Sequence, residues 1–306
     1  MDHLLTHLAG IVPDVTSYAL IPMEASTRCF YRLTRKEKPP VIFMQVNDTT
    51  HNITSIVQSQ KKLKTCAIPC AEIINFSTEG GWIVQNDLGD QHLLKSVTER
   101  GFTDLYQDAI QHIIRLQTRA SGDDLPYYAQ DDFIREANLF VSEFVTTLPL
   151  SRHIVSQINY AIRELANEIA AIPTTVVHKD YHSSNLIEYK NKIHVIDQQD
   201  MCIGPWTYDI ASLLFDCYIS WSDDIVNLLA NDFVAQHSNS YPDFYYSLHL
   251  TALQRHLKCL GLFMRLGRTG KPRYLSYLPR IKNRIIKFCD LLPKYAIFKI
   301  PIEASL

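Results

Sequence analysis

A short strand-forming segment interrupts the otherwise helical second half of this 306-residue chain. Residues 174–178, 185–189 and 192–197 are predicted to form three short strands, whereas the sequence on either side repeats apolar residues at helical spacing. Helices alone could have filled that space, so an island of strands indicates that a loop between them must be held in a defined position. The polar residues of this island are therefore the first candidates for a functional site.

The loop that follows the first of these strands reads HKDYHSSN. His178, Asp180 and Asn185 have the offsets H-x-D-x-x-x-x-N of a phosphotransferase catalytic loop. The last strand of the island ends in Asp197, where kinases place a metal-binding acid. Asp180 is predicted to be the catalytic base that meets the attacking hydroxyl. Asn185 and Asp197 are predicted to be the ligands of Mg²⁺, which prefers oxygen atoms and keeps some water.

Two other interpretations of the motif stay open at this stage. The pattern could occur by chance, although the strands and the downstream acid make that less probable. His178, Asp180 and His182 could instead form a zinc cluster, because histidine and carboxylate groups bind zinc. That interpretation leaves Asn185 and Asp197 without a role, and His178 is more simply a residue that braces the loop.

The rest of the chain divides into a strand-rich first part and a helical second part. The first part is predicted to contain three strands, one helix and two strands, and Pro39 and Pro40 are expected to break the chain before the third strand. A hinge is predicted at 88–90, the stretch between the two parts. The predicted strands are 18–22, 28–34, 41–46, 71–76 and 82–85, and the predicted helices are 51–64, 103–119, 131–146, 151–170, 207–219, 224–235, 244–266 and 277–290.

Composition excludes several classes of protein. Thirty Lys and Arg residues balance 32 Asp and Glu residues, for a net charge of -2, which argues against nucleic-acid binding. The sequence contains no apolar run long enough to span a membrane, and its N-terminus lacks the basic region of a signal peptide. Seven scattered cysteines without a C-x-x-C pair argue against a disulfide framework, so a cytoplasmic location is expected.

The catalytic loop, the downstream acid and the strand-rich first part resemble the aminoglycoside phosphotransferase and choline kinase superfamily. Within it, four segments resemble the bacterial anomeric kinases of N-acetylmuramate and N-acetylglucosamine. The resemblance implies an α+β, bilobal protein-kinase-like fold with a small β-rich N-lobe at 1–88 and a larger, mostly helical C-lobe at 89–306. The four segments are EASTRCFYRL (24–33), QNDLGD (85–90), GPWTYDIASLLFDCY (204–218) and LQRHLKCLGLFMRLGRTGKPRYL (253–275).

The resemblance also implies that ATP and Mg²⁺ are the cofactors. It assigns Ser26, Thr27 and Arg28 to the phosphates, through hydroxyl and backbone donors and one positive charge; a plain hairpin turn with an exposed arginine is the alternative. It assigns the backbone of the inter-lobe segment to adenine. The residues expected there are Gln85, Asn86 and Leu88.

The sequence departs from the protein-kinase pattern in its third strand. Met44 and Gln45 stand where kinases place the phosphate-binding lysine, and the predicted helix at 51–64 contains no acid to pair with it. Arg28 or Arg32 is expected to take over that charge. The departure also keeps a catalytically inactive, nucleotide-binding pseudokinase open as an interpretation.

The implied acceptor is the C1 hydroxyl of an amino sugar, phosphorylated to the α-1-phosphate in cell-wall recycling. The short span from Asp197 to Asp209 leaves no room for the activation segment of a protein kinase, and Asp209 is expected to bond to the catalytic-loop backbone. Another small-molecule acceptor, such as an aminoglycoside, choline or another sugar, remains an alternative. The sequence leaves the preferred sugar and the oligomeric state open.

Four residues are candidates for acceptor contacts. His182 lies inside the catalytic loop, and Asp200 follows Asp197 by three residues; Asp200 could equally be a solvated turn residue. Glu136 and Arg255 lie on predicted helices, and Arg255 shares a helix face with Lys258. Charged residues on a helix are usually solvated, but the anionic lactyl group of N-acetylmuramate would require a cation.

Overall fold

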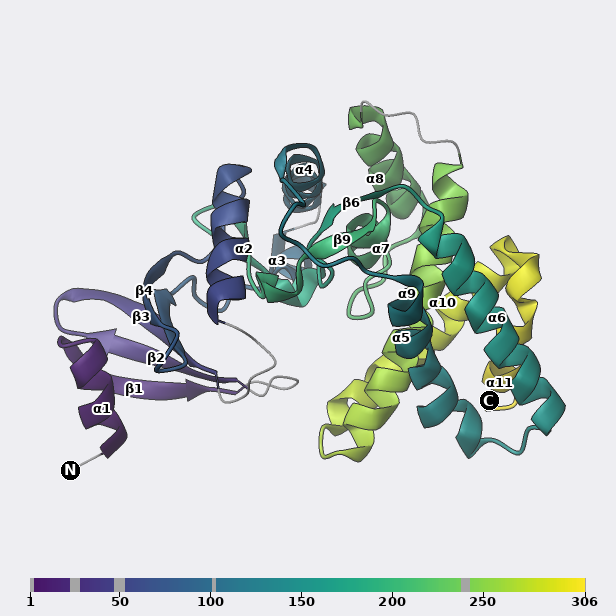
Figure 1. Cartoon of the computed structure of the whole chain (residues 1–306), viewed down its shortest axis with the longest axis horizontal. Coiled ribbons are helices and arrows are strands. Elements are labelled where there is room, and N and C mark those ends of the chain that lie inside the picture. The colour runs from purple at the N-terminus through teal and green to yellow at the C-terminus, as the bar shows by residue number, and fades with distance from the viewer. Residues whose placement is uncertain (1–2, 23–27, 47–52, 101–102, 238–242, 306) are drawn as a thin grey trace.

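The computed structural model describes residues 3–22, 28–46, 53–100, 103–237 and 243–305. A sheet at the N-terminal end and a bundle of helices at the C-terminal end form the two parts of the molecule (Figure 1). This confirms the predicted α+β, two-lobed fold. The division at 88/89 stays a prediction; it falls in the segment that joins the last strand of the sheet to the next helix.

The N-terminal region is a five-stranded antiparallel sheet with the strand order β1-β2-β3-β5-β4. The predicted order of three strands, one helix and two strands is confirmed. The structure adds one helix, α1, that the sequence did not predict. The elements are α1 (His3–Ile11), β1 (Val15–Ile21), β2 (Cys29–Arg35), β3 (Lys38–Gln45), α2 (Ile53–Thr65), β4 (Ile73–Ser77) and β5 (Trp82–Asn86).

The two helices cover opposite faces of the sheet. Because side chains alternate along a strand, Val41 and Phe43 of β3 pack with Leu8 of α1. Met44 belongs to the other face, where it packs with Ile56 of α2. The middle of the sheet is thus buried on both faces, and the face toward α2 is the one that continues into the inter-lobe cleft described below.

The expected break at Pro39 and Pro40 is wrong. Strand β3 begins at Lys38 and contains both prolines. The pairing of β3 with β2 shifts register between Leu33 and Arg35, opposite the start of β3. A proline lacks the N–H that a regular ladder needs, and the beginning of a strand beside an irregularity is where this loss is tolerated.

The C-terminal region is a set of helices around the long helix α9. Helices α5 and α9 lie so close together that only a glycine fits at position 261. A Cβ atom added there would come within 2.2 Å of the Leu139 backbone. The predicted helices are present, although α7 ends five residues before the predicted 219, and α3 and α11 were not predicted. The helices are α3 (Leu93–Arg100), α4 (Thr103–Arg119), α5 (Gln130–Glu143), α6 (Arg152–Ala170), α7 (Tyr208–Leu214), α8 (Asp223–Gln236), α9 (Phe244–Arg268), α10 (Leu278–Leu291) and α11 (Lys299–Glu303); short 3₁₀ helices are η1 (Val145–Thr147), η2 (Ser183–Asn185), η3 (Gln198–Asp200), η4 (Pro272–Tyr277) and η5 (Pro293–Phe298).

The strand island consists of two separate antiparallel pairs, between the sheet and the helices. The three predicted strands are present, and a fourth strand, β9, pairs with β6. The end of β9 is Gly204 and Pro205, two residues of low strand propensity, which explains why the sequence did not predict it. The pairs are β6 (Thr174–Val177) with β9 (Cys202–Pro205), and β7 (Leu186–Tyr189) with β8 (Lys192–Val195).

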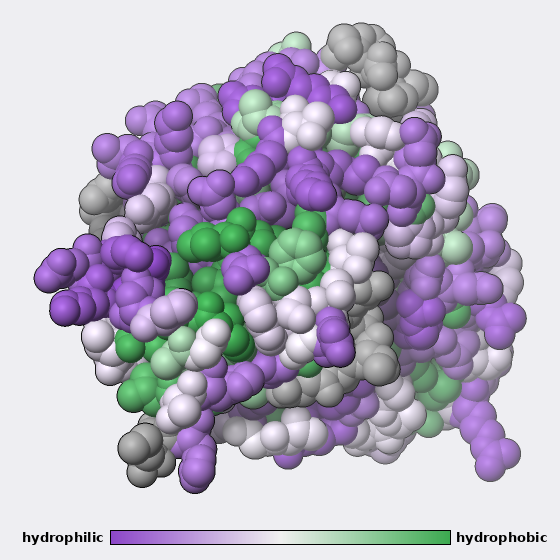
Figure 2. Space-filling view, turned by 60° about the vertical axis from the view of Figure 1, so that its left-hand side comes forward, coloured by the Kyte–Doolittle hydropathy of each residue, from purple (hydrophilic) through white to green (hydrophobic). Residues whose placement is uncertain are grey.

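Figure 2 brings the N-terminal side of the molecule forward and shows hydrophobic residues gathered near the middle of that face, with hydrophilic residues around them. Exposed apolar side chains of this half include Leu20, Ile74 and Phe76. Within the part of the chain that the structure describes, no helix is long and apolar enough to cross a membrane.

Candidate active site

The catalytic loop follows strand β6. Two acids, one in α7 and one just beyond its C-terminal end, accept hydrogen bonds from the loop backbone. Asp209 accepts hydrogen bonds from the backbone N–H groups of His178 (2.6 Å) and Lys179 (2.9 Å). Asp216, just beyond α7, accepts one from Ser183 (2.8 Å). The expected contact of Asp209 with the loop backbone is therefore present, and Asp216 adds a second support that the sequence did not predict.

The loop begins with a strained residue and a buried ring. Lys179 has a left-handed backbone with φ of 79°, a conformation that costs energy for a residue with a side chain and tends to persist at functional sites. His178 is fully buried and meets the ring of Tyr181 edge-on, with 5.7 Å between ring centroids. This packing fits the expectation that His178 braces the loop.

Asp180 lies among positive charges. Burial disfavours its charged form, but Lys258, followed by His182 and Arg255, outweighs burial and lowers the pKa of Asp180 to about 2. The carboxylate is therefore ionised at neutral pH and available to accept a proton. Such a low pKa makes it a weak base, suited to an acidic hydroxyl.

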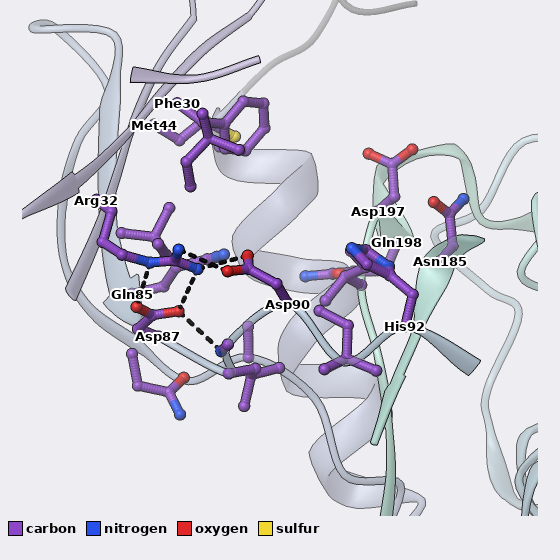
Figure 3. Close-up of a pocket in the computed structure, with 18 of the residues that line it drawn as sticks. Phe30, Arg32, Met44, Gln85, Asp87, Asp90, His92, Asn185, Asp197 and Gln198 are labelled. Atoms are coloured by element: carbon purple, nitrogen blue, oxygen red, sulfur yellow. Dashed lines mark hydrogen bonds and ion pairs between the residues drawn. The ribbon is translucent and has the colours of Figure 1, made fainter. Parts of the chain in front are cut away.

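Asn185 and Asp197 lie side by side with their side chains pointing the same way (Figure 3). The Asn185 amide nitrogen donates to the backbone oxygen of Asp180 (3.0 Å), which leaves the amide oxygen as a possible metal ligand. Asp197 follows the end of β8 by two residues and itself has a left-handed backbone, with φ of 65°. One carboxylate and one amide oxygen suit Mg²⁺, which takes its other ligands from water and phosphate.

A zinc cluster does not fit the same loop. Among the residues that the structure describes, no group of three or more His, Cys, Asp and Glu side chains is arranged to hold a metal ion. Structural zinc sites use four such ligands and catalytic sites use three. The donor set that is present matches a magnesium-type site, in which the protein supplies few ligands.

A cleft separates the sheet from the strand island. It contains Asn185 and Asp197 together with four of the residues predicted to bind the nucleotide. Ser26 and Thr27 lie outside the described residues. The predicted nucleotide residues that line the cleft are Arg28, Gln85, Asn86 and Leu88.

The walls of the cleft are largely apolar. Phe30, Ile42 and Met44 form the side toward the sheet, and Ile187 and Ile196 form the side toward the island. A flat aromatic base between two such walls would be removed from water on both faces. The cleft therefore has the shape and polarity of a nucleotide-binding site.

Arg28 and Arg32 both reach the cleft, but they have different partners. Arg32 is held by Asp87 (2.6 Å) and Asp90 (2.7 Å), beside the inter-lobe segment (Figure 3). Arg28 forms an ion pair with Asp197, at 2.7 Å. Of the two arginines that could replace the missing strand lysine, Arg28 is thus the one next to the candidate metal ligand.

A second, smaller pocket is lined by other residues of the catalytic loop. It brings together Asp180, His182 and Arg255, three of the predicted site residues. Burial lowers the pKa of His182, although Asp216 and Asp180 act in the opposite direction. The other lining residues are Ser212, Phe215, Asp216, Cys217, Tyr218, His256, Lys258, Cys259, Leu262 and Phe263.

Arg255 is fixed in this pocket by the catalytic loop itself. Its guanidinium donates to the backbone oxygen of Lys179 (3.0 Å) and lies over the ring of Tyr208, 4.6 Å from the centroid. Its side chain therefore positions the loop as well as contributing positive charge.

Glu136 has protein partners that the sequence did not predict. Its carboxylate pairs with Lys258 (2.9 Å) and Lys179 (3.5 Å), and accepts a short hydrogen bond from the hydroxyl of Tyr128. Burial opposes ionisation, but the two lysines outweigh it and lower the pKa of Glu136. Its role as a sugar contact stays a prediction, because these partners already engage both oxygens.

Asp200 lines a third cavity together with Lys179. It accepts a hydrogen bond from the Gln199 amide (3.0 Å), and Gln199 also donates to Asp197 (3.1 Å). Asp200 is thereby linked to the candidate metal ligand, and a direct contact with the acceptor stays a prediction.

Lys258 and Lys179 are the site residues that the sequence analysis did not select. Lys258 was recognisable only as a neighbour of Arg255 on one helix face, and Lys179 as an unspecified position inside the motif. Their common partner, Glu136, comes from a helix more than 40 residues before the loop, so sequence spacing gave no signal that the three would meet.

Comparisons with known proteins identify the family of the chain. The model of the family described as "Phosphotransferase enzyme family" matches residues 17–246. The N-acetylmuramate/N-acetylglucosamine kinase of Neisseria meningitidis serogroup B is 29% identical over 301 residues, which cover 90% of this chain and 87% of that protein.

Solved structures support the fold at low sequence identity. The choline kinase LicA from Streptococcus pneumoniae superposes with a TM-score of 0.70 at 12% identity, covering 94% of this chain and 99% of that one. The amicoumacin kinase hAmiN, solved with AMP-PNP and Ca²⁺, superposes with a TM-score of 0.64 at 13% identity, covering 93% of each chain.

Fold and site together define a kinase-like phosphotransferase: a sheet and a strand island enclose a cleft, and the catalytic-loop motif lies at its edge. The chain belongs to the phosphotransferase enzyme family.

Proposed function

We propose that this phosphotransferase uses Mg²⁺ and ATP to phosphorylate the C1 hydroxyl of N-acetylmuramate, N-acetylglucosamine or both, giving the α-1-phosphate in cell-wall recycling. The observation that supports this proposal is that Asp180 lines a pocket with Arg255 and Lys258, while Asn185, whose amide donates to the backbone oxygen of Asp180, lines the nucleotide-shaped cleft. The identity of the sugar rests on the similarity to the Neisseria kinase along nearly the whole chain.

Asp180 is proposed as the catalytic base. It would accept the proton of the C1 hydroxyl as the hydroxyl oxygen bonds to the γ-phosphorus and the bond to ADP breaks. A hemiacetal hydroxyl is more acidic than an ordinary alcohol, which suits a carboxylate with a pKa of about 2. Orientation of the hydroxyl by Asp180 would contribute alongside proton transfer.

Asn185 and Asp197 are proposed to hold Mg²⁺. The bound ion would neutralise phosphate charge and hold the phosphates in line with the acceptor. The amide oxygen of Asn185 and the carboxylate of Asp197 support this role, because they point into the same space beside the cleft (Figure 3). Gln85, Asn86 and Leu88 would bind adenine, and Arg28, with Ser26 and Thr27, the phosphates.

Arg255, His182 and Lys258 are proposed to face the sugar in the acceptor pocket. N-acetylmuramate carries a lactyl carboxylate that a cation would stabilise. The positive charges of Arg255 and Lys258 disfavour choline and aminoglycosides as acceptors, since both kinds of compound are positively charged. This distinguishes the proposal from the functions named for its structural neighbours.

The test is incubation of the protein with Mg-ATP and each sugar, followed by phosphorus NMR. The expected product is a phosphate on the anomeric carbon of at least one of the two sugars. A phosphate on O6, or turnover of choline or an aminoglycoside in preference to both sugars, would contradict the proposed acceptor. If no compound of a wider acceptor panel is phosphorylated although ATP binds, the pseudokinase interpretation takes its place.

A further inference from the structure

Arg28 crosses from the sheet to the strand island and is bound there by Asp197. Its guanidinium nitrogens lie 2.7 Å from Oδ1 of Asp197 and 3.0 Å from Oε1 of Gln199. The residue is 8% exposed, and its guanidinium lies 5.7 Å from the centre of the Phe30 ring. A cation this well buried and paired is part of the built site rather than a solvated side chain.

The position of Arg28 coincides with the place where a lysine is missing. A guanidinium nitrogen lies 4.0 Å from the sulfur of Met44, the strand residue that faces the cleft. Helix α2 has no acid in the residues Ile53–Thr65, so no partner from that helix would restrain a strand lysine. Arg28, the residue before strand β2, therefore places a positive charge beside Met44, the position where kinases have the strand lysine.

We propose that Arg28 and the divalent metal occupy the carboxylate of Asp197 alternately. Without nucleotide, Arg28 holds Asp197; when nucleotide binds, Arg28 moves to the phosphates and leaves the carboxylate to the metal. Metal and nucleotide then bind cooperatively through one arginine. This inference rests on the proposed use of ATP and Mg²⁺.

Competition for a single oxygen explains why the two cations alternate. Oδ1 of Asp197 accepts from Arg28 at 2.7 Å and from the Gln199 amide at 3.1 Å. A metal that took this oxygen without nucleotide would separate the buried guanidinium from the carboxylate that now accepts its hydrogen bond, which is unfavourable. The phosphate groups of a nucleotide offer that guanidinium stronger bidentate partners.

The decisive measurement is metal binding in the absence of nucleotide, with Mn²⁺ as an EPR-visible probe. Removing the competing cation with Arg28→Met is expected to tighten Mn²⁺ binding at least tenfold. The same variant is expected to weaken AMP-PNP binding about 10- to 100-fold, because the phosphates lose a charged partner. If Arg28 only supported the local structure, its replacement would weaken the binding of both Mn²⁺ and AMP-PNP.

Arg32→Met is the matched control. It removes an arginine from the same cleft, but one whose partners are Asp87 and Asp90. Mn²⁺ binding to this variant without nucleotide is expected to match that of the wild type. If Arg32→Met tightens Mn²⁺ binding as much as Arg28→Met does, competition at Asp197 is not the cause and the inference fails.

The double variant Arg28→Met with Met44→Lys places the positive charge on the third strand instead of at position 28. Because Met44 adjoins the guanidinium, the new lysine is expected to recover AMP-PNP affinity to within about fivefold of the wild type. No recovery would contradict the placement of the phosphate cation. A circular-dichroism melt of each variant separates these effects from unfolding.

The wild type alone gives a test that no folding defect can obscure. AMP-PNP is expected to tighten Mn²⁺ binding at least tenfold, and equal affinities with and without AMP-PNP would overturn the inference. A wild-type protein that binds no nucleotide, or phosphorylates neither sugar, would instead contradict the proposed function. Sugar phosphorylation by a wild type in which the two ligands bind independently would contradict the inference alone.

Discussion

The nucleotide cleft and the acceptor pocket meet at the catalytic loop, but their charged residues are arranged differently. The cleft has apolar walls on both sides, and the arginines described along it are each paired with carboxylates. The pocket on the other side of the loop contains Asp180 and Asp216 facing Arg255 and Lys258. On the proposed function, the cleft is expected to hold the nucleotide base mainly between its apolar walls, and the pocket is expected to hold the sugar mainly through Arg255 and Lys258.

The largest expected effect comes from the catalytic loop. Asp180→Asn is expected to lower kcat by about 10²- to 10⁴-fold, since the general base is lost while the shape is kept. Nucleotide affinity, measured by fluorescence with a labelled ATP analogue, is expected to stay within a factor of about two, because Asp180 lines the other pocket. A parallel loss of nucleotide affinity would show that the two sites are not separable.

Removal of a pocket cation comes next. Lys258→Met is expected to raise the KM for the sugar roughly 10- to 100-fold, the loss typical of a charged hydrogen bond. It is also expected to raise the pKa of Asp180 from about 2, because Lys258 is the positive charge that lowers it most. Steady-state kinetics with varied sugar check the first effect. Lys287→Met, which removes an exposed lysine paired with Asp223 on the surface, is the control and should leave the KM unchanged.

A smaller side chain in the apolar wall of the cleft tests how the nucleotide is held. Ile187→Ala is expected to weaken ATP binding about threefold to tenfold, at roughly 0.8 kcal/mol for each buried methylene lost from contact. The KM for the sugar is expected to stay unchanged, since Ile187 does not line the acceptor pocket. An increase in the sugar KM as large as the loss of ATP affinity would break the comparison.

The smallest effect is on the pH dependence of stability. The pKa of Asp180 is lowered from 3.8 to about 2 in the folded protein, so its ionisation stabilises the fold above pH 3.8 and that contribution is lost as the pH falls toward 2. Urea unfolding of the wild type and of Asp180→Asn between pH 4.5 and 2 checks this: the variant is expected to lose stability less steeply. Equal slopes would mean that Asp180 is not held ionised by its neighbours.

Local patterns predicted most of the fold. The β-branched and aromatic run at 41–46 and the helical spacing in 103–119 each correspond to an observed element, because strand propensity and burial of one helix face leave recognisable patterns in the sequence. Helix α1 was not predicted, since a nine-residue helix depends mainly on tertiary packing, here of Leu8 against the sheet. Strand β9 depends likewise on its partner β6.

The candidate site was predictable where the residues are close in sequence. The offsets within 178–185 and the strand that ends in Asp197 predicted the loop and the metal ligands, although their roles await the experiments above. The network of Glu136 with Lys258 and Lys179 could not be predicted, because it joins helices α5 and α9 and the loop across long sequence separations. Arg28 was assigned to phosphates, and its ion pair with Asp197 appeared only in three dimensions.

Helix α7 connects the catalytic loop with one wall of the acceptor pocket. Asp209 and Asp216 anchor the loop at both its ends, and Ser212 of the same helix lines the acceptor pocket. The proposed base and this wall of the pocket are therefore tied to one helix. Arg28 reaches Asp197, outside this unit, so an exchange of its partner would leave the contacts between the loop and α7 in place.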